Sequence, residues 1–254
     1  MRIGVTGGLK EWRAAARSGY DYFEANLASV AAMDGREFSE MKKLPHETGI
    51  YAEAFNGFLS GSVRLYECAD GWLKDYCDRA YERAAELGGR ISVIGSGRSR
   101  SVPDGMPFSD AEKRFAEILN IIGDSAERYG MRAVIEPLNR EECNFINTVD
   151  EGAAMCRRTG HRSVGLLVDF YHFYMNGESL DELGRAADIL WHAHIARPNR
   201  DRRAPEDEDV PLIRPYAEAL KSIGYGGRIS LECSWRTDIE TCAGEALHLM
   251  RDFK

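Results

Sequence analysis

Short apolar runs alternate with longer segments of helical periodicity along the whole chain. Each apolar run has few charges in its middle and ends at glycine or polar residues, which is the pattern of a strand buried on both faces. Eight runs predict strands, at residues 2–7, 20–27, 51–59, 90–97, 132–138, 164–172, 189–196 and 228–235. Strands of this kind favour a parallel sheet covered by helices.

The segments between these runs predict amphipathic helices, and residues 108–130 give the clearest signal. There Ser109 is the predicted N-cap, Glu112 follows three residues later, and Gly130 marks the helix end. Eight strand–helix units without a dividing linker predict one parallel (β/α)8 TIM barrel domain over residues 1–254. A doubly wound open sheet is the alternative, but it usually has fewer strands, and no GxGxxG motif follows the first strand.

Composition and charge narrow the class of protein. The chain has 254 residues, 44% of them hydrophobic, and no apolar run long enough to span a membrane. Its start, MRIGVTGG, lacks the features of a signal peptide. The net charge of −8 argues against nucleic acid as the main partner. Six cysteines without a CxxC pair indicate reduced thiols, so we expect a cytoplasmic protein.

Polar residues stand at the carboxyl ends of four successive predicted strands, where TIM barrels carry their active sites. Buried polar groups are unfavourable unless they have partners, so their coincidence at one depth favours a functional site over four separate structural pairs. The candidates are Glu136, Asp169 with the nearby His172, the pair His192 and His194, and Glu232.

The spacing of the two histidines distinguishes their roles. His192 and His194 are two residues apart on one strand, so both point to the same face, and His194 is nearer the carboxyl end. Three carboxylates and one imidazole form an oxygen-rich site that favours Mn²⁺ or Mg²⁺, with Co²⁺ or Zn²⁺ as alternatives. His192 lies one layer deeper, where we expect it to hydrogen-bond within the barrel and support the site.

The motifs around these residues match a known superfamily in letters and in spacing. The segments VIEPLNREECNFINT, LLVDFYH, HAHIARPNR and ISLEC resemble the sugar phosphate isomerase/epimerase superfamily with the xylose isomerase-like barrel. Among its members, the chain is most similar to ketose 3-epimerases of the D-tagatose/D-psicose type. The resemblance covers residues from about 70 to the end, and the first three strands more loosely.

The resemblance implies roles for individual residues. It makes Glu136, Asp169, His194 and Glu232 the ligands of one divalent metal ion, with Mn²⁺ favoured. It also makes Glu136 and Glu232 the acid/base pair. The residues implied to contact a sugar substrate are Glu142, His172 and Arg200.

The reaction implied is the movement of a proton at a carbon beside a carbonyl, through an enediolate. We expect ketose 3-epimerisation, with or without a phosphate on the sugar. The alternatives are an aldose–ketose or hydroxypyruvate-type isomerase, a dehydratase or lyase on the same metal site, and a catalytically silent sugar-binding barrel. The superfamily's abasic-site endonucleases need several more histidines than this chain offers on its third and fourth strands.

Two weaker signals accompany the main site. In the loop GSGRSRSVPDGMP, Arg98 and Arg100 either bind an anionic group of the substrate or belong to a surface loop. Glu24 and Asn56, at the ends of the second and third predicted strands, either line the pocket or form buried structural pairs. By analogy with similar barrels we expect a homo-oligomer, either a dimer or a tetramer.

Overall fold

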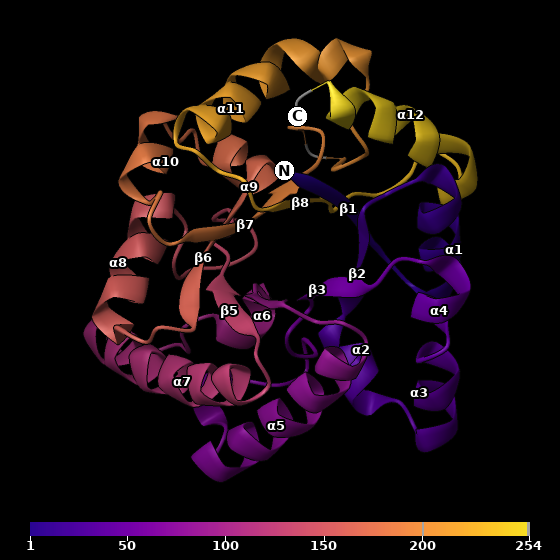
Figure 1. Ribbon diagram of the computed structural model, residues 1–254. Coiled ribbons are helices and arrows are strands. Elements are labelled where there is room, and N and C mark those ends of the chain that lie inside the picture. Colours follow the sequence, from indigo (N-terminus) through magenta and orange to yellow (C-terminus); the bar gives the residue numbers. More distant parts are fainter. Residues whose placement is uncertain (200, 253–254) are drawn as a thin grey trace.

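The computed structural model, which describes residues 1–199 and 201–252, is a closed barrel of eight parallel strands (Figure 1). The strands follow one another around the barrel in chain order, and β8 closes it by pairing with β1. Their bounds are β1 Arg2–Gly7, β2 Tyr22–Asn26, β3 Ala52–Asn56, β4 Ile91–Ile94, β5 Arg132–Ile135, β6 Val164–Asp169, β7 Leu190–Ile195 and β8 Arg228–Leu231. The predicted TIM barrel and all eight predicted strands are confirmed, although several strands are shorter than the runs that predicted them.

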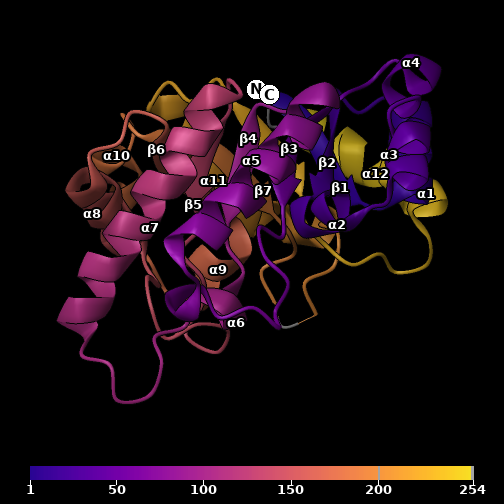
Figure 2. The ribbon, with the colours of Figure 1, turned by 90° about the horizontal axis from the view of Figure 1, so that it is seen from below.

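Helices form an outer ring around the strands (Figure 1). The longer ones are α1 Leu9–Ser18, α5 Asp70–Glu86, α7 Phe108–Arg128, α8 Val149–Thr159, α11 Val210–Ser222 and α12 Ile239–Arg251. Short elements lie between them: α2 Leu27–Ala32, α3 Gly35–Met41, α4 Leu44–Thr48, α6 Gly97–Arg100, α9 Phe170–Met175, α10 Asp181–Arg185, η1 Leu65–Glu67 and η2 Asp207–Asp209. Figure 2 shows α6 and α9 toward the same end of the barrel, since each directly follows the carboxyl end of a strand.

Strand alternation creates two separate apolar layers. The large cluster between strands and helices includes Phe23 and Ala25 of β2, whereas Tyr22 of the same strand belongs to a smaller cluster. That smaller cluster fills the barrel interior and contains Tyr22, Ala54, Ile91, Val93, Val134 and Leu167, with Trp191 packed against it. Since Glu24 is two residues beyond Tyr22, it faces the interior one layer nearer the carboxyl end.

The predicted start of α7 was wrong by two residues. The helix begins at Phe108 with Pro107 as its N-cap, so Ser109 lies inside the first turn and does not cap it. Proline fixes its own φ near the value found here, −60°, and so sets the start of the helix. The predicted end is correct, because α7 stops at Arg128 and Gly130 takes a left-handed conformation.

Two further predictions concern the cysteines and the helices that could span a membrane. All six cysteines are free thiols. Among the helices of residues 1–199 and 201–252, none is long and apolar enough to cross a membrane.

Candidate metal and active site

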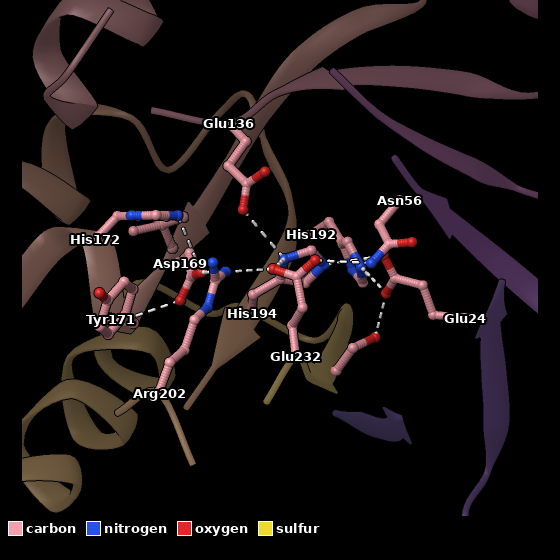
Figure 3. Close-up of polar contacts among 12 residues, drawn as sticks. Glu24, Asn56, Glu136, Asp169, Tyr171, His172, His192, His194, Arg202 and Glu232 are labelled. Atoms are coloured by element: carbon pink, nitrogen blue, oxygen red, sulfur yellow. Dashed lines mark hydrogen bonds and ion pairs between the residues drawn. The ribbon is translucent and has the colours of Figure 1, made fainter. Parts of the chain in front are cut away.

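Four candidate ligands converge at the carboxyl end of the barrel (Figure 3). Glu136 directly follows β5, Asp169 ends β6, His194 lies near the end of β7, and Glu232 directly follows β8. One ligand atom from each lies within 4.8 Å of the others. The structure therefore brings together the same four residues that the strand pattern singled out.

His194 lies at the centre of this cluster. Its Nδ1 is 3.3 Å from Oε1 of Glu136 and 3.1 Å from Oε2 of Glu232. Asp169 stands opposite His194 in the register of β6 and β7. Gly95 leaves room for the cluster, since a Cβ there would lie 2.2 Å from Oε2 of Glu136.

Arg202 contacts this cluster, and sequence reasoning did not single it out. Its Nη2 donates to Oδ2 of Asp169 at 2.7 Å and to Oε2 of Glu232 at 2.5 Å. Its guanidinium lies over the ring of Tyr171, 4.9 Å from the centroid. Arg202 is in a loop and has a positive φ of 45°, and no periodicity in the sequence predicts such a position. The resemblance pointed instead to Arg200, which lies outside the described residues.

The two glutamates have unequal acidities. Burial raises the pKa of Glu136 above its usual range, and the neighbouring Glu232 raises it further. Burial alone would also raise the pKa of Glu232, but His194 and Arg202 outweigh it and hold that pKa well below its usual value. Burial would lower the pKa of His194, but Glu24 and Glu232 raise it well above its usual value. Glu136 is thus the weaker acid of the pair and Glu232 the stronger.

His172 presents a proton donor toward the cluster. The backbone N–H of Asn139 donates to its Nδ1 at 3.2 Å, so the proton of the neutral ring lies on Nε2. That Nε2 is buried, has no hydrogen-bond partner among the described residues, and is 3.7 Å from Oδ2 of Asp169. Glu142 stands nearby, half exposed, with Oε1 3.0 Å from Nδ2 of Asn139 and Oε2 4.0 Å from Nη1 of Arg202.

The loop arginines separate in the structure. Arg98 is exposed and lines a hollow of 410 Å³ together with Glu141 and Glu142. Arg100 is only 1% exposed and turns inward, where its Nη2 donates to the backbone oxygen of Glu136 at 2.7 Å. The two arginines therefore do not form one anion-binding group.

A second buried cluster lies directly beneath the first. Glu24, whose exposure is 0%, has Oε1 at 3.0 Å from Nε2 of His194 and Oε2 at 2.9 Å from Nε2 of His192. Nδ1 of His192 lies 3.2 Å from the backbone oxygen of Arg228. His192 is thus outside the four-residue cluster, one layer deeper. Asn56 is a further support, since its Nδ2 donates to Oε1 of Glu232 at 2.7 Å.

Comparison with known proteins places this geometry in a family. The family profile described as "Xylose isomerase-like TIM barrel" matches residues 12–253. The D-psicose 3-epimerase of Agrobacterium fabrum is 26% identical over 226 residues, which are 85% of this chain and 76% of that protein. The 3-dehydro-D-guloside 4-epimerase of Escherichia coli is 27% identical over 247 residues, which are 88% of this chain and 86% of that protein.

Solved structures show the same fold. The crystal structure of a D-allulose 3-epimerase from Methylomonas sp. in complex with D-allulose has a TM-score of 0.84 and 21% sequence identity. The likeness covers 100% of this chain and 97% of that one.

Proposed function

Because the chain belongs to the xylose isomerase-like TIM barrel family, we propose that it is a metal-dependent isomerase or epimerase of a sugar or sugar phosphate, and that it epimerises a ketose at carbon 3. The observation that carries this proposal is the cluster of Glu136, Asp169, His194 and Glu232. The pKa values of its two glutamates are shifted in opposite directions. Epimerase relatives at 26% and 27% identity support it.

The residues of the cluster fit a divalent metal ion. Three buried or half-buried carboxylates lie within 4.8 Å of one another, and the single charge of Arg202 does not balance them, so they fit a divalent cation. Three oxygen ligands and one imidazole nitrogen suit Mn²⁺, with Mg²⁺, Co²⁺ and Zn²⁺ as alternatives. When bound, the ion supplies Lewis-acid stabilisation of the negative charge that develops on substrate oxygens.

The two glutamates move the proton. In the forward direction Glu232, the stronger acid of the pair, is ionised and accepts the proton from the carbon beside the carbonyl. The C–H electron pair then becomes part of the enediolate of the sugar. Glu136, on the other face of the substrate, returns a proton to the same carbon, and the configuration inverts. The reverse reaction exchanges the two roles.

The surrounding polar groups hold the sugar in place for this transfer. His172 offers its Nε2–H to a substrate oxygen, because none of the residues that the structure describes accepts from that donor. Glu142 and Arg202 stand 4.0 Å apart and offer an acceptor and a donor to sugar hydroxyls. Arg200 remains a proposed substrate contact by resemblance alone.

A second candidate is epimerisation at carbon 4 of a 3-dehydro sugar, as the name of the Escherichia coli relative describes. A ketone at carbon 3 and a proton at carbon 4 present the same chemistry to the two glutamates as a ketone at carbon 2 and a proton at carbon 3. Aldose–ketose isomerisation, dehydration and lysis on the same site are further alternatives.

The test is deuterium uptake from D₂O by a panel of ketoses, ketose phosphates and 3-dehydro sugars. The protein is stripped of metal and reloaded with Mn²⁺, beside Glu136→Gln and Glu232→Gln. We expect metal-dependent exchange at the carbon next to the carbonyl, reduced by about 10²-fold or more in both variants. The exchanging carbon identifies the reaction. Tight metal binding without exchange on any sugar contradicts the epimerase proposal and favours the lyase or the silent barrel.

A further inference from the structure

We infer that Glu24 is a positioning residue: its carboxylate orients His194 so that Nδ1, and not Nε2, faces the three carboxylates of the site. This inference rests on the proposed function, because it takes His194 to be a metal ligand. It concerns a residue on β2, on the other side of the barrel from the four candidate ligands of β5–β8 (Figure 3).

Both carboxylate oxygens of Glu24 are hydrogen-bonded by buried side chains. Oε1 is bound by Nε2 of His194, and Oε2 is bound by Nε2 of His192 and by the hydroxyl of Ser230. The hydroxyl of Tyr22 in turn lies 2.7 Å from that of Ser230. Each of these side chains is fully buried, so water does not compete for these bonds.

An ionised carboxylate can only accept hydrogen bonds, and this fixes the ring of His194. Nε2 must carry its proton toward Glu24, and the lone pair available for a metal ion is then the one on Nδ1. Nδ1 is the atom that lies 3.3 Å from Glu136 and 3.1 Å from Glu232. A carboxylate that accepts from the far nitrogen of a ligating histidine also makes the ligating nitrogen more basic.

A metal ion held between Glu24, His192 and His194 is the alternative to this hydrogen-bonded arrangement, and the stoichiometry of bound metal distinguishes the two. Their ligand atoms lie within 4.8 Å of one another, but the pairs at 2.9 and 3.0 Å are at hydrogen-bond distance. All three side chains have an exposure of 0%.

Glu24→Gln tests the inference without changing the shape of the side chain. The amide cannot accept hydrogen bonds from both histidines with full strength, and its NH₂ group can donate to Nε2 of His194, which moves the ring proton to Nδ1. Glu53→Gln is the matched control. Glu53 is a buried glutamate on the neighbouring strand β3, but it binds Arg2 and Arg228 at the opposite end of the barrel.

The measurement is Co²⁺ and Mn²⁺ affinity by competition with a chelator, together with the visible spectrum and the stoichiometry of bound Co²⁺. We expect one ion per chain, an affinity reduced about 10–100-fold by Glu24→Gln with an altered Co²⁺ spectrum, and an affinity within about 2-fold of the parent in Glu53→Gln. Equal losses in both variants, or no loss in Glu24→Gln, overturn the inference. A second bound ion that Glu24→Gln removes also overturns it, because Glu24 is then a ligand.

A measurement on the unaltered protein keeps the inference testable if Glu24→Gln does not fold. Long-range ¹H–¹⁵N spectra of the Zn²⁺-loaded protein report which nitrogen of His194 carries the proton. We expect protonated Nε2 and metal-bound Nδ1, and metal-bound Nε2 overturns the inference. If the unaltered protein binds no metal ion, the proposed function fails first, so the two failures are distinguishable.

Discussion

Arg202 places a guanidinium against two of the carboxylates at the carboxyl end of the barrel. Its Nη2 contacts Oδ2 of Asp169 and Oε2 of Glu232, and both residues are proposed metal ligands. A guanidinium and a divalent cation that need the same oxygens compete for them. We therefore expect the loop that carries Arg202 to influence both the metal affinity of the proposed site and its contacts with the sugar.

Replacing this arginine should strengthen metal binding. We expect Arg202→Met to raise the Mn²⁺ affinity several-fold and to raise the KM for the sugar, measured by chelator competition and by initial rates. Arg203→Met is the control, since Arg203 lies next to it in sequence but pairs with Asp201. Weaker metal binding in Arg202→Met would show that the arginine supports the metal ligands and does not compete with them.

Residue by residue, the site was predictable where a polar side chain interrupts a buried strand. Glu136, Asp169 and Glu232 stand out because a carboxylate at the end of a strand buried on both faces is unfavourable unless it has a partner. Glu24 was equally buried, but its partners His192 and His194 are 168 and 170 residues away in the chain. No local pattern in the sequence shows such a pairing, so the sequence alone left the role of Glu24 open, and the fold was needed to bring β2 and β7 together.

At the level of elements, the strands were predictable and the loops were not. Strand alternation and helix periodicity recur over many residues, so one residue that departs from the pattern does not change the predicted element. The short helix α6 lies after β4. On this helix Arg98 is exposed and Arg100 is buried, and no periodicity over four residues distinguishes the two. The start of α7 likewise depended on a single proline, Pro107.

Glu178 links two elements, and we expect it to give the stability of the fold a pH dependence. It follows α9, and its Oε2 accepts the backbone N–H of Val149 at 2.6 Å, at the start of α8. Burial raises the pKa of Glu178 from its usual 4.5 to about 8, although the bond from Val149 opposes the rise. The folded protein keeps this proton where the unfolded chain has released it, so the stabilising contribution is complete below about pH 4.5 and is lost as the pH rises through 8.

Glu178→Gln should remove this dependence, because the amide oxygen still accepts from Val149 but carries no charge. We expect the Tm of the variant, relative to the parent, to rise between pH 5 and pH 9, measured by thermal unfolding monitored by circular dichroism. Asp181→Asn, nearby at the exposed start of α10, is the control and should give a flat difference. A constant difference in Tm for Glu178→Gln over this range would mean that Glu178 stays ionised in the folded protein.

Over the whole molecule, the barrel separates its buried charges from its apolar filling. The apolar cluster of the barrel interior, against which Trp191 packs, lies nearer the amino ends of the strands than the candidate site does. Glu53 pairs with Arg2 and Arg228 at those amino ends. The candidate site takes its four proposed ligands from β5 to β8 and its supports Glu24 and Asn56 from β2 and β3. A site built on six strands of one closed sheet is held by the fold itself, which favours fixed ligand positions.

Metal binding should therefore stabilise the entire barrel. A ligand set drawn from four strands exists only when the barrel is closed, so the ion binds the folded chain and adds RT ln(1 + [L]/Kd) to the free energy of unfolding. At 100 times the Kd this is about 2.7 kcal/mol, which for a chain of this size corresponds to about 5–10 °C in Tm. We expect the Tm to rise by this amount from the chelator-treated protein to the Mn²⁺-loaded one, and to change little in Glu136→Gln. An equal rise in that variant would place the ion elsewhere on the protein, and no rise in the parent would contradict the proposed metal site.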